Sequence, residues 1–143
     1  MTKPFLLYRS SAGSGKTYTL TLEYLKLALK NPKSGYRQIL AVTFTNKATQ
    51  EMKERIVEVL ERLSRLVKPG ESLDDELMRH LDLDEEQLML RARMTLLHIL
   101  HGYGHVAVST IDSFFQKVIR SFAREMDLQA KFDVEMDTDA VLD

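Results

Sequence analysis

The sequence contains no cysteine, which excludes a disulfide framework and any metal site built from cysteine thiolates. It has no apolar run that approaches the roughly 20 residues of a membrane span. The apolar residues 5–8, Phe-Leu-Leu-Tyr, are too few for the hydrophobic region of a secretory signal. Internal repeats and low-complexity tracts are lacking too. These absences favour a cytoplasmic protein without a membrane segment.

The charges of the sequence are unevenly distributed. With 143 residues, of which 44% are hydrophobic and 29% charged, the chain has the size and composition of one globular domain. Residues 1–70 hold 13 Lys and Arg against 5 Asp and Glu, whereas residues 71–143 hold 7 against 16. The basic half suits a polyanion such as ATP or nucleic acid. Chance clustering on solvated helix faces is the simpler alternative, and charge alone does not decide between the two.

A glycine-rich segment near the N-terminus carries the clearest chemistry. Residues 10–17 are Ser-Ser-Ala-Gly-Ser-Gly-Lys-Thr, and they lie between the short apolar run and a helical pattern that continues to about residue 30. A strand, a glycine-rich turn and a helix that opens on Gly-Lys-Thr form the context of a phosphate-binding P-loop. Gly13 and Gly15 allow a tight turn close to a ligand because they lack Cβ atoms. Ser10 stands where the general pattern has glycine, and a turn that merely caps a helix is the structural alternative.

This segment predicts ATP and Mg²⁺ as ligands. Its N–H groups and the positive end of the helix would face an anion. Lys16 would supply a charge to the β- and γ-phosphates and Thr17 a hydroxyl to Mg²⁺, which makes these two the predicted catalytic residues. The predicted nucleotide-binding residues are Ser11, Ala12, Gly13, Ser14, Gly15, Lys16 and Thr17.

The hydrophobic pattern predicts an α/β fold. Helices are expected over residues 15–30 and 47–67. The apolar run at 38–44 predicts a strand that is buried on both faces. Thr45 and Asn46 offer caps for the second helix. Alternation of strands and helices implies a parallel sheet flanked by helices. Further elements are then expected at helices 73–81 and 85–101, a strand at 106–109 and a helix at 114–126.

The second acidic motif of a P-loop NTPase is hard to find in this sequence. Such enzymes use a buried strand that ends in Asp, often followed by Glu, to hold Mg²⁺. Asp112, after the strand at 106–109, is the best candidate, but no Glu stands beside it. A cap on the following helix is the favoured alternative for Asp112. Because the predicted sheet has few strands and the last residues resemble the start of a helix, we expect a piece of a longer protein.

Three blocks of sequence together resemble one family. Residues 11–17 are similar to the Walker A motif of superfamily 1 DNA helicases. Residues 41–48, Ala-Val-Thr-Phe-Thr-Asn-Lys-Ala, with 51–56, Glu-Met-Lys-Glu-Arg-Ile, are very similar to motif Ia of the UvrD/Rep type. Residues 109–115, Ser-Thr-Ile-Asp-Ser-Phe-Phe, resemble the motif that follows it, usually Thr-Ile-His-Ser-Phe. The strong matches cover about a quarter of the chain. The early P-loop and the helical insertion look more like the RecB/AddA helicase–nuclease branch.

The resemblance implies a RecA-like P-loop NTPase fold with an incomplete sheet and a helical insertion. It divides the chain into residues 1–70 and 105–126 of the first helicase domain, an insertion at 71–104, and the start of a following subdomain at 127–143. It implies an ATP-dependent DNA helicase, or a helicase–exonuclease with a partner protein, that moves on single-stranded DNA in repair or recombination. The chain by itself is expected to be inactive. The residues implied to contact DNA are Thr45, Asn46, Lys47, Thr110, Ser113 and Phe114.

Other interpretations remain open at this stage. A complete small P-loop NTPase or nucleotide kinase would use Asp112 as its Mg²⁺ carboxylate, although the acidic insertion argues against it. A non-enzymatic module could bind nucleic acid through its basic half. His98, His101 and His105 have spacings that could suit a metal, but the sequence Gly-Tyr-Gly at 102–104 breaks a helix between the last two.

Overall fold

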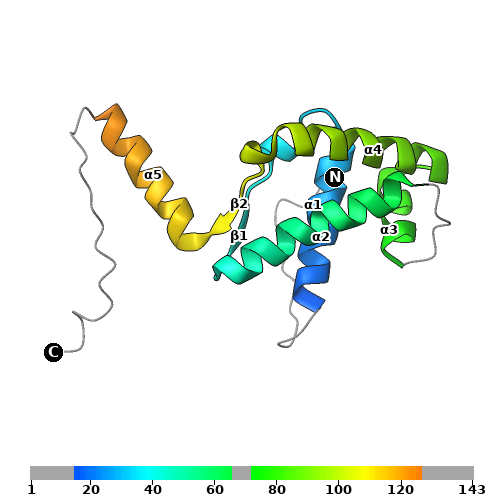
Figure 1. Cartoon of the computed structure of the whole chain (residues 1–143), viewed down its shortest axis with the longest axis horizontal. Coiled ribbons are helices and arrows are strands. Elements are labelled where there is room, and N and C mark those ends of the chain that lie inside the picture. Colours follow the sequence, from blue (N-terminus) through cyan, green and yellow to red (C-terminus); the bar gives the residue numbers. More distant parts are fainter. Residues whose placement is uncertain (1–14, 66–71, 127–143) are drawn as a thin grey trace. The chain divides into compact units, whose positions relative to one another are not determined.

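The architecture was obtained as a computed structural model, in which residues 15–65 and 72–126 are described. The chain divides into two compact units, Met1–Thr110 and Ile111–Asp143. The described part of the first unit contains, in order, α1 (Gly15–Lys30), η1 (Gly35–Gln38), β1 (Ala41–Thr43), α2 (Asn46–Ser64), α3 (Ser72–Leu81), α4 (Glu85–His101), η2 (Tyr103–His105) and β2 (Val108–Thr110) (Figure 1). The described part of the second unit is the helix α5 (Ile111–Glu125).

The sheet of the described residues consists of β1 and β2, which run parallel. Its register places Ala41 opposite Val108 and Thr43 opposite Thr110. The helices α2, α3 and α4 lie between the two strands in sequence, and parallel strands require a long crossover of this kind. The parallel α/β arrangement predicted from the sequence is therefore confirmed for these two strands. The strand expected at residues 5–8 lies outside the described residues.

The prediction for the strand at 38–44 is wrong in two respects. The strand is limited to Ala41–Thr43, because residues 35–38 form the 3-10 helix η1 instead. It is also not buried on both faces: Leu40, Val42 and Phe44 are 49%, 37% and 87% exposed. An apolar run indicates that a segment can be buried, but the elements that cover it must come from elsewhere. The part of the chain that the structure describes does not cover this face of β1.

The helices follow the sequence signals closely. α1 begins and ends where it was predicted, and the insertion forms α3 and α4 as expected. At the start of α4 a capping box is present, in which Asp84 accepts from the backbone N–H of Gln87 and Gln87 accepts from that of Asp84. α2 ends at Ser64, three residues earlier than predicted, because Arg65 adopts an extended backbone.

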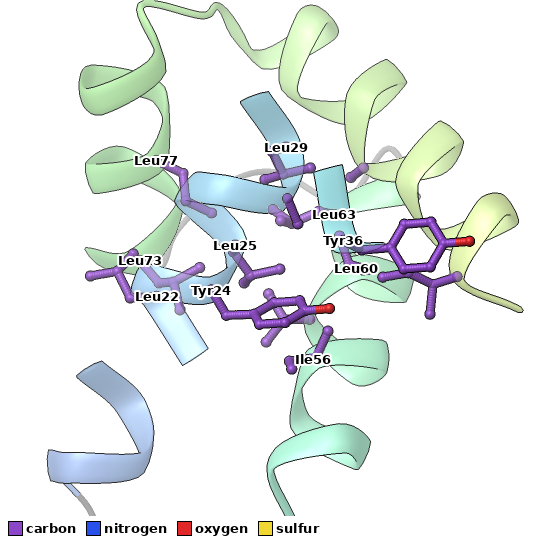
Figure 2. Packing of buried hydrophobic residues seen from close by; sticks show 14 of the residues in the cluster. Leu22, Tyr24, Leu25, Leu29, Tyr36, Ile56, Leu60, Leu63, Leu73 and Leu77 are labelled. Carbon is purple, nitrogen blue, oxygen red and sulfur yellow. The ribbon is translucent and has the colours of Figure 1, made fainter. Parts of the chain in front are cut away.

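The hydrophobic core of the first unit lies between its helices. Figure 2 shows Leu25 and Leu29 of α1 facing Leu60 of α2, with Leu77 of α3 beside them. The long contact between α2 and α4 closes a further side of this core. Fully burying a leucine stabilises the fold by about 1.5–3 kcal/mol. The buried apolar residues include Leu22, Tyr24, Leu25, Leu29, Tyr36, Met52, Ile56, Val59, Leu60, Leu63, Leu73, Leu77, Leu88, Ala92 and Ile99.

Two clusters of charged side chains connect α3 to α2 and α1. Arg62 of α2 donates two hydrogen bonds to the fully buried carboxylate of Asp74, at 2.8 and 2.6 Å. Lys26 of α1 donates to Glu23 and to Glu76 of α3, each at 2.9 Å. Burial alone would lower the pKa of Lys26, but the hydrogen bonds to the two glutamates outweigh it and raise that pKa above its usual value. The insertion is therefore joined to α1 and α2 by ion pairs as well as by leucines.

The second unit contributes an amphipathic helix. Along α5, Phe115, Ile119 and Phe122 are exposed apolar residues, while the rings of Phe114 and Phe115 lie 5.8 Å apart. Lys117, Arg120 and Arg124 are exposed on the same helix. In the described ranges 15–65 and 72–126, no helix combines the length and the hydrophobicity that crossing a membrane requires.

Candidate functional site

The N-terminus of α1 carries the predicted phosphate-binding residues that the structure describes. Gly15 and Lys16 are exposed and Thr17 is half-buried. Ser11, Ala12, Gly13 and Ser14 lie outside the described residues. The first turns of the helix are braced by hydroxyl groups, because Thr19 donates to the Gly15 carbonyl at 2.9 Å and Thr21 to the Thr17 carbonyl at 2.8 Å. The first N–H groups of a helix have no acceptor within it, so this end favours an anion.

A cavity of about 670 Å³ opens beside this helix end. Gly15 and Thr17 contribute to one wall, and Glu51, Glu54 and Glu58 of α2 to another. The volume falls in the range of small-molecule sites. Because carboxylates repel phosphate groups, phosphates are favoured at the α1 side of the cavity. The described lining residues are Gly15, Thr17, Tyr18, Thr21, Glu51, Glu54, Arg55, Glu58, Val59 and Leu73.

Several of these lining residues were missed in the sequence. Tyr18 is 42% exposed, lines the cavity and shares a hydrogen bond of 3.2 Å with Ser72. Because Tyr18 directly follows Thr17, the sequence could have indicated that it lies near the predicted nucleotide site. Glu51 and Glu58 each stand four residues before an arginine, a spacing that would also suit ion pairs on a solvated face. Only the packing of α2 against α1 shows that they face the cavity.

The turn between β1 and α2 presents the predicted DNA-contacting residues of motif Ia. Thr45 is the N-cap of α2, and its hydroxyl accepts from the backbone N–H of Ala48 at 3.0 Å, which confirms the predicted cap. Thr45, Asn46 and Lys47 are all exposed. Within residues 15–65 and 72–126, the ion pair of Lys47 is a long contact of 3.8 Å with Glu51, between two exposed side chains. Such a pair contributes little to stability and leaves the ammonium group accessible to an anion.

The residues of the third predicted motif are divided between the two units. Thr110 ends β2 opposite Thr43, so its backbone lies at the same sheet edge as the β1–α2 turn. Its side chain is only 8% exposed and offers little surface. Ser113 and Phe114 are partly exposed residues of α5, in the second unit. The structure therefore brings Thr110 to the motif Ia turn, and it describes Ser113 and Phe114 only within their own helix.

The cap predicted for Asp112 is wrong. α5 begins at Ile111, so Asp112 lies inside its first turn, where it is exposed. A carboxylate there still interacts favourably with the positive end of the helix. Concerning the histidines, the ring nitrogen Nδ1 of His101 lies 2.7 Å from the Leu97 carbonyl oxygen. No group of three or more His, Cys, Asp or Glu side chains in the described residues is arranged to hold a metal ion.

The chain combines a parallel pair of strands, a polar turn at the end of β1 and a helix that opens on Gly-Lys-Thr after a glycine-rich sequence. These features are those of a P-loop type of α/β protein. Residues 1–142 match the family of the UvrD/REP helicase N-terminal domain, and the chain belongs to this family. It is similar to the A subunit of the ATP-dependent helicase/nuclease of Clostridium novyi, with 34% identity over 139 residues, which cover 96% of this chain and 9% of that protein.

The protein of the same name from Bacillus cytotoxicus is 33% identical over 136 residues, or 94% of this chain and 9% of the relative. A Bacillus cereus relative with this name is 32% identical over the same shares of both chains. The chain thus spans about a tenth of the length of these curated relatives. No solved structure matches it. These findings confirm the resemblance to UvrD/Rep-type helicases and to their helicase–nuclease branch.

Proposed function

We propose that this chain is the ATP-binding N-terminal part of an ATP-dependent DNA helicase of the helicase–nuclease kind, which moves on single-stranded DNA during repair or recombination. The observation that supports this most directly is the exposure of the first residues of α1 beside a cavity. Lys16 is exposed there, and Thr17 lines a cavity large enough for a nucleotide. Family membership and the parallel α/β arrangement favour a RecA-like fold for the whole domain.

In this proposal the α1 end binds the triphosphate. Lys16 acts as a point charge on the β- and γ-phosphates, and the N–H groups from residue 11 to residue 17 surround them. The oxygen donors near this end fit Mg²⁺, which prefers hydroxyl, carboxylate and water oxygens. Thr17 would hold the ion, with the glutamates of the opposite wall as further oxygen groups in the cavity. Bound Mg²⁺ would neutralise charge on the phosphate oxygens.

The DNA-binding part of the proposal uses the carboxyl edge of the sheet. Ligands of α/β sheets bind where strands end, and both β1 and β2 end here. Thr45, Asn46 and Lys47 would contact the backbone of single-stranded DNA, together with Thr110. Ser113 and Phe114 are proposed as further contacts, with Phe114 as a stacking or supporting ring.

The name of the relatives supports two further parts of the proposal. They are called one lettered subunit of an enzyme, which suggests that the full-length protein works with a partner subunit. The words "helicase/nuclease" in the same name suggest an exonuclease activity elsewhere in that protein. The relatives come from bacteria, whose DNA lies in the cytoplasm, and this is the location proposed for the protein.

The test is a titration of the chain with a fluorescent ATP analogue and Mg²⁺, followed by a phosphate-release assay on the same sample. We expect binding that requires Lys16, with negligible turnover, because the sequence has no convincing second acidic motif. Lys16→Ala should abolish the binding. Lys30→Ala, which removes an exposed lysine from the other end of the same helix, is the matched control and should bind as the unmodified chain does.

Two outcomes would redirect the proposal. Turnover that is lost in both Lys16→Ala and Asp112→Asn would indicate a self-sufficient small NTPase with Asp112 as its Mg²⁺ carboxylate. Absence of nucleotide binding, with DNA affinity unchanged by Lys16→Ala, would indicate a non-enzymatic nucleic-acid module.

A further inference from the structure

Thr43 and Thr49 form a hydroxyl pair directly beneath the exposed β1–α2 turn. Their Oγ1 atoms lie 2.6 Å apart, and Thr43 Oγ1 also lies 3.1 Å from the carbonyl oxygen of Thr45. Thr43 is buried and Thr49 is half-buried. The pair thus connects the end of the strand, the cap residue and the first turn of the helix.

The direction of these hydrogen bonds follows from their chemistry. A carbonyl oxygen only accepts, so the single proton of the Thr43 hydroxyl goes to Thr45. The bond between the two hydroxyls is then donated by Thr49 to Thr43. The Thr45 carbonyl also accepts the backbone N–H of Thr49 at 3.0 Å. Thr49 is therefore connected to the turn through both its backbone and its side chain.

This use of a helical hydroxyl differs from that of three other helical hydroxyls in the described residues. Thr19, Thr21 and Ser121 each donate to the carbonyl four residues earlier in their own helix, as serine and threonine often do within helices. Thr49 could do the same with Thr45, but it bonds across to the strand. Threonine is also a poorer helix former than alanine, and the cap of α2 is already supplied by Thr45.

We propose that the Thr43–Thr49 hydroxyl pair positions the turn at residues 44–47 for contact with single-stranded DNA. The inference rests on the proposed function, because it assigns positioning residues to that DNA site. Holding the turn in one conformation before DNA arrives reduces the ordering that binding must otherwise impose. Removing one neutral hydrogen bond of this kind should weaken DNA binding about five-fold, which corresponds to a net contribution of about 1 kcal/mol.

The test compares variants of the chain in a titration with a labelled oligothymidylate. Thr49→Val removes the hydroxyl with little change of shape, and we expect about a five-fold loss of affinity. Thr49→Ser keeps a hydroxyl and should restore most of it. Ser64→Ala, which removes from the same helix a hydroxyl that donates to the Glu61 carbonyl of that helix, is the matched control and should leave affinity unchanged. Thr43→Val should weaken binding as well. The double variant should lose no more binding free energy than the sum of the two single losses, because the two hydroxyls act through one chain of hydrogen bonds.

A second measurement separates positioning from general destabilisation. Amide hydrogen exchange in Thr49→Val should accelerate at residues 46–49 and stay unchanged at Ile56 and Leu60 in the buried part of α2. The dependence of affinity on salt should keep its slope, because no phosphate contact is removed. Lys47→Ala should instead reduce that slope by about 0.7 for a single-strand contact.

The outcomes distinguish this inference from the function on which it rests. Suppose that Lys47→Ala weakens DNA binding but Thr49→Val changes neither the affinity nor the hydrogen exchange at the turn. The positioning role of the Thr43–Thr49 pair is then wrong, while the proposed DNA site at the turn is supported. Failure of Thr49→Ser to restore binding also overturns the role of the hydroxyl. If the unmodified chain does not bind the oligonucleotide, or Lys47→Ala has no effect, the proposed DNA site fails and the inference falls with it.

Discussion

The helical side and the sheet edge of the first unit are built in opposite ways. Between α1, α2 and α3, leucines pack without exposure, and ion pairs close the remaining contacts. Along β1, alternate apolar side chains stay open to solvent, and the turn that follows is polar and exposed. The comparison indicates that stability is concentrated in the helical side, whereas the proposed DNA-binding groups of the turn lie where the described fold is least covered. Substitutions on the two sides should therefore differ in what they change.

The largest effect is expected from Asp74→Ala. The carboxylate is fully buried and bound by Arg62 through two hydrogen bonds, so its loss leaves the half-buried guanidinium without that partner. Breaking one side of a buried ion pair typically destabilises by about 3–5 kcal/mol. Urea denaturation would measure the free energy of unfolding, and Asp75→Ala, at the exposed neighbouring residue, serves as the control. A similar small loss in both variants would show that α3 does not depend on this pair.

A pH-dependent effect is expected from Tyr24. Burial, with a smaller contribution from the charge of Tyr36, raises the pKa of Tyr24 from 10.0 to about 12. Because the folded-state pKa lies above the unfolded one, the stability linked to Tyr24 is complete below pH 10. It is lost as the pH rises to about 12, by about 2–3 kcal/mol in total. Lys26, whose pKa is also raised, loses its contribution in the same alkaline direction.

Tyr24→Phe isolates the tyrosine in that pH profile. The Tyr24 hydroxyl has no hydrogen-bond partner in the described part of the chain, so the variant should be about as stable at neutral pH. Its unfolding free energy should fall less steeply than that of the unmodified chain above pH 10. Two parallel pH profiles would contradict the assignment.

A smaller effect is expected from Gly102→Ala at the end of α4. A Cβ at this position would lie 2.3 Å from the hydroxyl of the buried Tyr36, so one of the two groups must move. Overpacking of this kind costs about 1–3 kcal/mol. In the double variant with Tyr36→Phe the hydroxyl is gone, and the nearest remaining atom of that ring is 3.4 Å away. Thermal unfolding should show partial recovery in the double variant. No recovery would place the strain elsewhere.

The smallest effect on stability is expected from Phe44→Ala, on the sheet side. The ring is 87% exposed, so its removal should change the free energy of unfolding by less than about 0.5 kcal/mol. Leu25→Ala, at a fully buried position of α1, is the contrasting variant and should cost about 2–5 kcal/mol in the same denaturation experiment. A large loss in Phe44→Ala would mean that the sheet face is covered after all.

Much of the helical architecture was readable from local signals. The cap at Thr45 was predicted correctly, and the capping box at Asp84 and the apolar spacing of Met52, Ile56 and Leu63 are likewise local patterns that act over a few residues. The errors concern features that depend on distant partners. The exposure of Val42 depends on what lies over the sheet, and an apolar sequence contains no information on that.

The features of the candidate site also fall into two groups, those that local sequence patterns predict and those that depend on packing. The glycine-rich sequence before Lys16 and the motif Ia turn could be recognised from residue types and spacing. The cavity could not, because α2 presents its glutamates to α1 only after the two helices pack. The sequence places Glu58 one helical turn before Arg62, but only the structure shows that Arg62 binds Asp74 of α3, at 2.8 and 2.6 Å.

By itself, the sequence determined the helices, the caps of α2 and α4, the parallel order of β1 and β2 and the family to which the chain belongs. These properties depend on hydrophobic periodicity and on short motifs, which act over a few neighbouring residues. Only the tertiary structure decided which glutamates face the α1 end, which face of β1 stays open and that two threonine hydroxyls meet beneath the turn. The reason is that burial and hydrogen bonding between distant residues depend on how the helices pack in space.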